Sequence, residues 1–337
     1  MNARGVILLN TGSPDSPDVR HVRQYLREFL MDPRVMDLPW LLRALIVNFA
    51  VLPFRARFSA AAYAKIWTSN GSPLVTTCRR VQGLLQDRLG LPVELGMRYG
   101  NPSIASALER LLGHNIDELV AVPLFPHYAI SSYETAVART RELIGEMAPD
   151  LSVIVQPPFY DHPAYIEALV ATAEPELRPG FDHLLFSFHG LPGRHIRKAD
   201  PTRKHCLGRS DCCEIDSSAT PTCYRAQCLR TIKAFIAKAG LGGCNCSFAF
   251  QSRFGPGRWL QPETFDTIEQ LGQQGCKRLV VICPSFVADC LETLEEIGVR
   301  AKGLYQKAGG GEFVMVPCLN DHPAWIDALA RMLKELA

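Results

Sequence analysis

The fold is indicated by Leu184-Leu185-Phe186-Ser187-Phe188-His189-Gly190-Leu191-Pro192, an apolar run that ends in a histidine and a turn. The run predicts a buried β-strand, and Gly190 and Pro192 predict the turn after it. In open parallel sheets, ligands bind beyond the carboxyl ends of the strands. An imidazole there can accept a proton or hold a metal ion near neutral pH, so His189 is a candidate catalytic residue. The alternative is a histidine that caps the turn by hydrogen bonding.

A second apolar run, Leu279-Val280-Val281-Ile282-Cys283-Pro284-Ser285-Phe286, leads into an acidic helix. Glu292 and Glu296 are four residues apart, so they share one helix face and repel each other. A site that accepts protons or binds a cation explains this arrangement better than helix stability does. The alternative is a capping box formed by Asp289 and Glu292.

Strand-like and helix-like segments alternate along the chain. This alternation is typical of βαβ units and predicts an α/β fold, with mainly parallel strands covered by helices on both faces. The expected strands are 5–10, 92–98, 117–124, 151–156, 182–188, 245–250, 277–283 and 312–316. The expected helices are 17–30, 72–89, 103–113, 132–147, 162–177, 224–239, 262–274, 289–299 and 322–336.

The chain also contains a trace of duplication. The segment 118–125 resembles 278–286, and each precedes a helix that carries Glu-Thr, at Glu134-Thr135 and Glu292-Thr293. We therefore predict two similar domains, and a cleft between such halves is a common ligand site. The predicted domains are 1–160, 161–320 with a cysteine-rich insertion at about 200–224, and a C-terminal helix at 321–337 that packs back on the body.

Composition narrows the class of protein. The chain has 337 residues, of which 47% are hydrophobic and 21% charged, which suits two globular domains. The net charge of +2 gives no indication of a nucleic-acid partner. Glycine-rich nucleotide-binding motifs are absent from the sequence. The N-terminus has no secretory signal pattern, so we expect a cytoplasmic protein.

One segment, residues 38–54, is unusually apolar. It is shorter than the ~20 apolar residues of a membrane-spanning helix, and Arg43 and Asn48 interrupt it. It is either a buried core helix or an exposed apolar lip that receives an apolar ligand or rests on a membrane.

The 12 cysteines are unevenly distributed. In a reducing cytosol, clustered cysteines indicate metal binding rather than disulfides. Five of them lie in a polar segment, at Cys206, Cys212, Cys213, Cys223 and Cys228. A long irregular loop needs something to hold it, such as an iron–sulfur cluster or a zinc ion. Adjacent cysteines suit a two-iron cluster better than one tetrahedral ion, so we favour the cluster, with zinc or no metal as alternatives.

In combination, several motifs resemble the ferrochelatase family, which inserts ferrous iron into a porphyrin in the last step of haem synthesis. The resemblance runs from Gly5 to about residue 330 and is broken mainly by the cysteine loop. Its motifs are Leu9-Asn10-Thr11-Gly12-Ser13-Pro14, Gly71-Ser72-Pro73-Leu74, Met97-Arg98-Tyr99-Gly100, Ser187-Phe188-His189-Gly190-Leu191-Pro192, Gln251-Ser252-Arg253-Phe254-Gly255-Pro256 with Trp259, and Asp289-Cys290-Leu291-Glu292-Thr293-Leu294.

The resemblance implies two Rossmann-like domains with the porphyrin between them. It implies that His189, Glu292 and Glu296 are catalytic, and that His189 and Glu292 can also bind the ferrous iron substrate. The implied porphyrin-binding residues are Thr11, Arg98, Tyr99, Ser131 and Trp259. Relatives place a bulkier residue at Thr11. The apolar 38–54 segment matches the family's pocket lip, where peripheral membrane contact is expected.

The inserted loop resembles a bacterial variant that carries its cluster ligands internally. The resemblance implies a 2Fe-2S cluster on Cys206, Cys212, Cys213 and Cys223. The ordinary family sequence resumes at Tyr224, which leaves Cys228 as the spare cysteine. Two alternatives remain: a chelatase for coproporphyrin, another tetrapyrrole or another ion, and a non-catalytic carrier of tetrapyrrole or iron.

Overall fold

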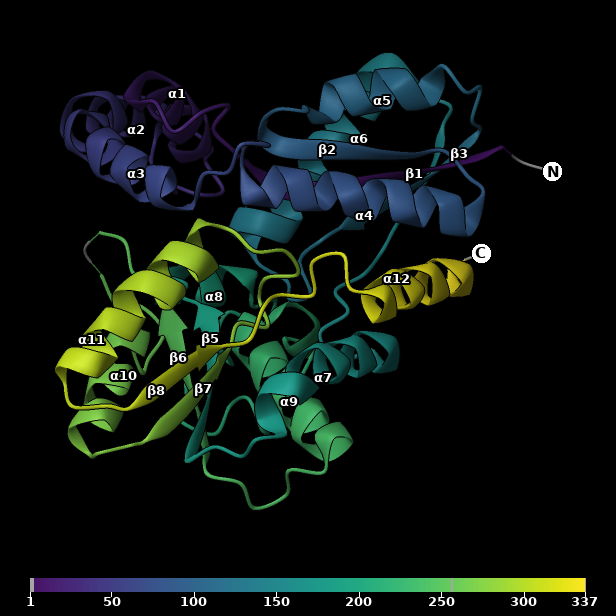
Figure 1. The fold of residues 1–337 in the computed structure, drawn as a ribbon. Helices are drawn as coiled ribbons and strands as arrows, with labels where there is room; N and C mark the ends of the chain where they lie inside the picture. The colour runs from purple at the N-terminus through teal and green to yellow at the C-terminus, as the bar shows by residue number, and fades with distance from the viewer. Residues whose placement is uncertain (1–2, 256, 337) are drawn as a thin grey trace. The chain divides into compact units, whose positions relative to one another are not determined.

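The structure is a computed structural model that describes residues 3–255 and 257–336 (Figure 1). Pro256, part of the Gln251 motif quoted above, lies outside the described residues. The chain divides into two compact units. Unit 1 is formed by Met1–Leu124, Ile130–Pro157 and Met332–Ala337, and unit 2 by Phe125–Ala129 and Pro158–Arg331.

Unit 1 is built on a four-stranded sheet of order β2-β1-β3-β4, with every pair of neighbours parallel. Its strands are β1 (Arg4–Ser13), β2 (Val93–Gly100), β3 (Glu118–Pro123) and β4 (Ser152–Val155). The helix α4 (Pro73–Leu89) runs along one face of the sheet and α5 (Ile104–Leu112) along the other (Figure 1). The remaining helices of the unit are α1 (Val19–Leu30), α2 (Trp40–Leu45), η1 (Ile46–Val51), α3 (Leu52–Ile66), η2 (Ile130–Glu134) and α6 (Thr135–Met147).

Unit 2 repeats this arrangement with a four-stranded parallel sheet of order β6-β5-β7-β8. Its strands are β5 (His183–His189), β6 (Cys246–Gln251), β7 (Arg278–Ile282) and β8 (Glu312–Met315). The helices of the second half of the chain are α7 (Pro163–Leu177), α8 (Gly193–Ala199), η3 (Thr220–Thr222), α9 (Tyr224–Ala239), α10 (Thr264–Gln273), η4 (Glu292–Ala301), α11 (Lys302–Lys307) and α12 (Pro323–Glu335).

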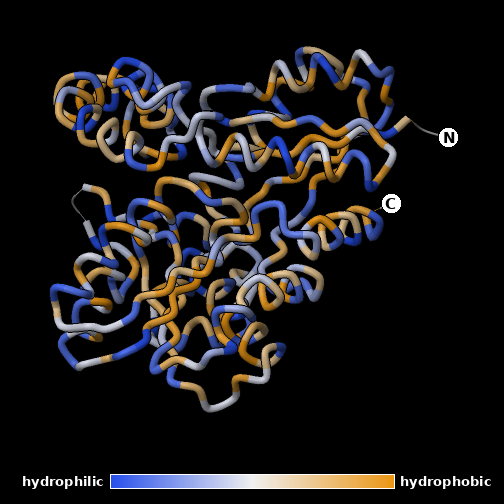
Figure 2. The backbone as a smooth tube through the Cα atoms, in the orientation of Figure 1, coloured by the Kyte–Doolittle hydropathy of each residue, from blue (hydrophilic) through white to orange (hydrophobic). Residues whose placement is uncertain are grey.

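The strands read as continuous apolar runs because helices cover both faces of each sheet. Leu184, Leu185 and Phe186 in β5 are all fully buried. On one face of the unit 2 sheet, Leu185 packs with Ile268 of α10 and Ile297 of η4 in a single core. The strands accordingly appear as mostly hydrophobic segments in Figure 2. The expected α/β fold is thereby confirmed.

The two sheets have the same strand order, which bears out the trace of duplication in the sequence. In unit 1 Gly5 pairs with Leu119, and in unit 2 His183 pairs with Leu279, the residue that aligns with Leu119. Counting along each first strand from these pairs, Thr11 in β1 holds the position that His189 holds in β5. One half thus carries a histidine where the other carries a threonine.

Both repeats contain a π-helical segment after their third strand, η2 in unit 1 and η4 in unit 2. The sequence predicts ordinary α-helices over 132–147 and 289–299. The hydrophobic periodicity did not distinguish the wider π-helical turn from an α-helical one. π-helical turns are rare and occur often at functional sites. Glu292 and Glu296 both lie in η4, and Ser131 lies in η2.

Candidate active site

His189 is the last residue of β5, at the carboxyl edge of the unit 2 sheet. Its Nδ1 atom lies 2.7 Å from the carbonyl oxygen of Gly190. A carbonyl oxygen can only accept, so Nδ1 carries the hydrogen and donates it. In the neutral ring, Nε2 is therefore left as the proton acceptor. The half-buried imidazole is thus oriented to take up a proton at Nε2.

The turn after His189 leaves no room for a side chain. A Cβ atom built on Gly190 would lie 2.6 Å from the carbonyl oxygen of Gln251 and 3.4 Å from a ring carbon of Trp259. The indole of Trp259 therefore packs directly on the turn. Its Nε1 hydrogen is buried and meets no acceptor within the described part of the chain. Such a donor is available to an acceptor atom of a ligand.

Glu296 is buried and is held by Ser252 from the loop after β6. The main-chain N–H of Ser252 donates to Oε1 at 2.8 Å, and its hydroxyl donates to Oε2 at 2.7 Å. Burial is the main cause that raises the pKa of Glu296, and the charge of Glu292 raises it further. The hydrogen bonds from Ser252 and the Arg300 guanidinium oppose this shift without cancelling it.

Glu292 is half-buried at the start of η4, and its electrostatic effect on Glu296 agrees with the predicted shared helix face. The capping-box alternative is not what the structure contains. The main-chain N–H of Asp289 donates to Asn320 at 2.9 Å, where a capping box would use Glu292. The Asp289 carboxylate instead accepts from Thr293 at 3.0 Å and from Asn320 at 2.7 Å.

A buried glutamine, Gln251, connects these groups. Its Nε2 donates to the carbonyl oxygen of Glu292 at 2.7 Å, and its Oε1 accepts from Ser187 at 2.7 Å. It also pairs with His189 in the β5–β6 register. The histidine strand and the first turn of η4 are therefore held by one side chain. Gln251 and Ser252 fall within a quoted family motif, but no spacing rule had assigned them these contacts.

In unit 1, Arg98 and Tyr99 converge on a carboxylate that the sequence did not single out, Asp32. Arg98 Nη2 and the hydroxyl of Tyr99 donate to Asp32 Oδ2 at 2.5 and 2.9 Å, and the hydroxyl of Thr135 donates to the same atom at 2.5 Å. Burial by itself would raise the pKa of Asp32, but these hydrogen bonds, one from the Arg34 main chain and the charge of Arg98 together lower it. Asp32 follows a helix as Met31-Asp32-Pro33, which carries no functional signal.

The other predicted porphyrin residues of unit 1 occupy similar strand and helix ends. Thr11 is half-buried near the end of β1, and Ser131 is half-buried in η2. Tyr99 is only 1% exposed; its hydroxyl donates to Asp32 and its ring packs edge-on against Phe29. The porphyrin-binding role of Thr11, Arg98, Tyr99, Ser131 and Trp259 stays a prediction.

Comparison with known proteins decides the family. Residues 3–337 match the family model described as ferrochelatase. The ferrochelatase of Stutzerimonas stutzeri is 49% identical over 334 residues, which cover 98% of each chain. That of Azotobacter vinelandii is 49% identical over 336 residues, which cover 99% of each chain. The chain belongs to the ferrochelatase family. It is accordingly a lyase that inserts iron into a porphyrin in haem biosynthesis.

Solved structures show the same fold at much lower identity. SirB from Bacillus subtilis with Fe3+ is 10% identical, with a TM-score of 0.56 over all of this chain and 96% of that one. The sirohydrochlorin chelatase SirB of Bacillus subtilis subspecies spizizenii, in complex with cobalt, is 8% identical, with a TM-score of 0.54. The chain thus has the same fold as these SirB chelatases.

The cysteine loop brings four thiols near one another. Cys212 Sγ lies 3.9 Å from Cys213 Sγ, and the Cys223 thiol interacts with those of Cys206 and Cys213. Arg225 donates to Cys213 Sγ at 3.1 Å. Across residues 3–255 and 257–336, no three or more His, Cys, Asp or Glu side chains are arranged to hold one metal ion.

The apolar 38–54 segment forms α2, η1 and the start of α3, and most of its large side chains face outward. Phe49 is 75% exposed and Trp40 63% exposed, which excludes the core-helix alternative. The exposed apolar side chains of this surface are Trp40, Leu41, Leu42, Leu45, Phe49, Phe54 and Phe58. Every described helix is too short or too polar to span a bilayer.

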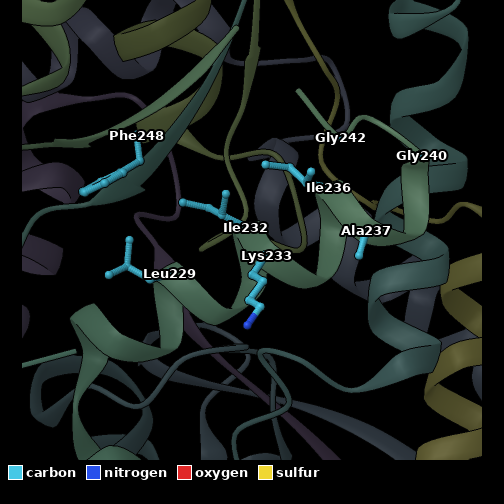
Figure 3. Close-up of a pocket in the computed structure, with 8 residues that line it drawn as sticks. All are labelled: Leu229, Ile232, Lys233, Ile236, Ala237, Gly240, Gly242 and Phe248. Carbon is cyan, nitrogen blue, oxygen red and sulfur yellow. The ribbon is translucent and has the colours of Figure 1, made fainter. Parts of the chain in front are cut away.

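A pocket of about 730 Å³ lies beside α9 and β6 in unit 2 (Figure 3). Apolar side chains such as Leu229, Ile232 and Phe248 line it, together with the stem of Lys233. None of its lining residues is a predicted site residue.

Proposed function

We propose that the chain inserts ferrous iron into protoporphyrin IX, with His189 as the base that removes a pyrrole proton. The observation that carries the proposal is the orientation of His189, whose Nδ1 is engaged by Gly190 and whose Nε2 is left to accept. Metal insertion releases two pyrrole protons for each divalent ion. A bent macrocycle turns a pyrrole nitrogen out of the ring plane, and binding elsewhere on the ring supplies that strain.

Glu292 and Glu296 then carry the protons away. The raised pKa of Glu296 brings its titration closer to neutral pH, where a relay must both accept and release a proton. Glu292 lies within electrostatic range of it, nearer the start of the helix. In the alternative order of events, His189 and Glu292 bind the iron first, since imidazole and carboxylate both suit ferrous iron.

Porphyrin fluorescence under anaerobic conditions tests the proposal. Purified protein with ferrous iron should quench protoporphyrin fluorescence catalytically, and His189→Ala should abolish turnover while porphyrin still binds. His114→Ala, an exposed histidine in unit 1, is the matched control and should behave as wild type. Normal turnover by His189→Ala would contradict the assignment. Faster turnover of coproporphyrin in a parallel assay would contradict the choice of substrate, and binding without turnover by the wild type would indicate a carrier.

We propose further that Cys206, Cys212, Cys213 and Cys223 hold a 2Fe-2S cluster. A zinc ion needs four ligands that converge on one point, whereas a two-iron cluster takes two thiolates on each iron. The four thiols are linked in series, Cys206 to Cys223, Cys223 to Cys213 and Cys213 to Cys212. An extended series of this kind fits the two-iron pattern better than four ligands at one point. Arg225 beside Cys213 offsets thiolate charge. When bound, the cluster ties the loop together, because its binding free energy adds to the folding free energy.

The exposed apolar side chains of α2, η1 and α3 support a third proposal, a cytoplasmic enzyme that rests peripherally on a membrane. These large side chains all fall within residues 40–58, and exposed apolar patches mark interaction surfaces. Flotation with lipid vesicles tests it. The wild type should float with the vesicles, and a variant with Phe49→Ser and Phe58→Ser should not. Equal recovery of both proteins in the vesicle fraction would contradict this role.

A further inference from the structure

The main-chain groups of His189 lie beyond the end of the neighbouring strand. β5 pairs with β7 only as far as Phe186 and Ile282, whereas on the other side it pairs with β6 up to His189. The N–H and C=O of His189 therefore need partners other than a strand. Two side chains supply them, Tyr224 and Ser285.

These contacts form a closed ring of hydrogen bonds. The hydroxyl of Tyr224 donates to the carbonyl oxygen of His189 at 2.8 Å, since a carbonyl can only accept. The 2.7 Å contact between Tyr224 and Ser285 must then be donated by Ser285, and Ser285 Oγ accepts from the N–H of His189 at 3.4 Å. Each of the three donors is used once.

The Tyr224 side chain is held in place by its packing. It is only 5% exposed. Its ring packs edge-on against His127, with the centroids 5.6 Å apart. The hydroxyl is therefore fixed in position.

Tyr224 is also the first residue after the cysteine loop. It is the first residue of α9 and follows Cys223 directly. One turn later, the Nε2 of Gln227 donates to the carbonyl oxygen of Pro221 at 2.8 Å, and its Oε1 accepts from the main chain of Tyr128 at 2.7 Å. The end of the loop and the start of the helix are therefore one braced unit, and Tyr224 extends from it to His189.

We propose that Tyr224 is a positioning residue through which the cysteine loop holds His189 in its catalytic orientation. The inference rests on the proposed role of His189 as the base and of Cys223 as a cluster ligand. It gives the cysteine loop a role in the reaction, and this role requires no change of redox state. When the loop loosens, the ring of hydrogen bonds opens and the imidazole loses its fixed support.

Tyr224→Phe tests the clamp, because it keeps the aromatic ring and removes only the hydroxyl. We expect kcat to fall about tenfold with KM for porphyrin unchanged, as for a reacting group moved out of alignment. Amide hydrogen exchange should accelerate in the peptide that contains His189. Tyr305→Phe is the matched control, since it removes another buried tyrosine hydroxyl of unit 2, bound to the carbonyl oxygen of Cys276.

The link to the loop is tested by combining Tyr224→Phe with Cys212→Ser. Cys212→Ser alone should lower kcat and accelerate exchange at His189, and the double variant should be no worse than the poorer single variant. If the two substitutions lowered kcat independently, so that their effects multiplied in the double variant, the proposed coupling would be wrong. Wild-type kcat and wild-type amide exchange in Tyr224→Phe would also overturn it. Ser285→Ala breaks the same ring and replaces Tyr224→Phe if that variant does not fold. Retained turnover by His189→Ala would instead refute the proposed function itself.

Discussion

Ser252 holds both oxygens of the Glu296 carboxylate, through its main-chain N–H and its hydroxyl. Ser252 itself has a φ of +64°, a left-handed conformation that is uncommon for a residue with a side chain. The loop after β6 is thus shaped so that one residue can reach both oxygens. These two hydrogen bonds hold the buried carboxylate in position, and they offset only part of the free-energy cost of burying its charge.

Glu296→Gln should lower kcat by about 10²-fold or more, the usual contribution of a proton-transfer group. It should also change the pH dependence of stability. Because the folded pKa of Glu296 is raised, the wild type loses stability as the pH rises from the ordinary carboxyl value to the folded one. The glutamine variant lacks this loss, so its melting temperature should match the wild type in acid and exceed it at pH 7. A difference between their melting temperatures that shrank with rising pH would contradict the assignment.

Asp32→Asn should destabilise unit 1 by about 3 kcal/mol, because it leaves the Arg98 guanidinium without its buried partner. The pKa of Asp32 is lowered, so its stabilising effect is present above its ordinary pKa and disappears as the pH falls through the folded value. Urea unfolding at pH 7 and near pH 3 should therefore show a large difference from wild type at pH 7 and a smaller one in acid. Glu142→Gln, which alters an exposed pair with Arg139, should unfold at the same urea concentration as the wild type.

Gly190→Ala and Gly83→Ala should have opposite effects on the free energy of unfolding. At Gly190 the added methyl group meets the carbonyl oxygen of Gln251, so the turn must move, at a cost of about 1–3 kcal/mol. At Gly83, exposed in α4 with open space around it, alanine should stabilise by about 0.5–1 kcal/mol. Calorimetry with activity assays would check both, and only Gly190→Ala should also reduce kcat. Equal stability of the two variants would refute the steric argument.

Cys212→Ser should remove the iron and labile sulfide of the proposed cluster, together with its visible absorption, and should lower the melting temperature. Cys228→Ser is the matched control. Cys228 is fully buried, and its thiol lies beside Tyr224, within the α9 helix rather than the loop. Its replacement should leave iron, sulfide and spectrum intact. Loss of the spectrum in Cys228→Ser, or its retention in Cys212→Ser, would reassign the ligands.

The sequence predicted the strands closely because each is a short apolar run between turn residues. His189 and the acidic helix were also located from the sequence, since the carboxyl end of a parallel strand is where ligands bind. The helix type was not predictable. An acidic pair four residues apart falls near one face in both α and π geometry, so η4 gave no separate signal.

The partners of the site residues were harder to find. Asp32 and Thr135 are far from Arg98 in the sequence, and only the folded chain brings them together. Tyr224 and Ser285 are also distant from His189 in the sequence. Tyr224 reaches it from the start of α9, and Ser285 from the loop after β7. Periodicity and motif spacing describe local order, and these contacts depend on the register of strands that are distant in the chain.

The cysteine loop occupies residues 200–223, between the end of α8 at Ala199 and the start of α9 at Tyr224. It therefore lies inside the crossover from β5 to β6, outside every strand of the sheet. Lengthening such a connection costs little free energy, because loop-closure entropy grows only with the logarithm of loop length. A lineage can therefore acquire or discard the whole loop as a module, with no change of strand register, while Tyr224 stays behind in the helix.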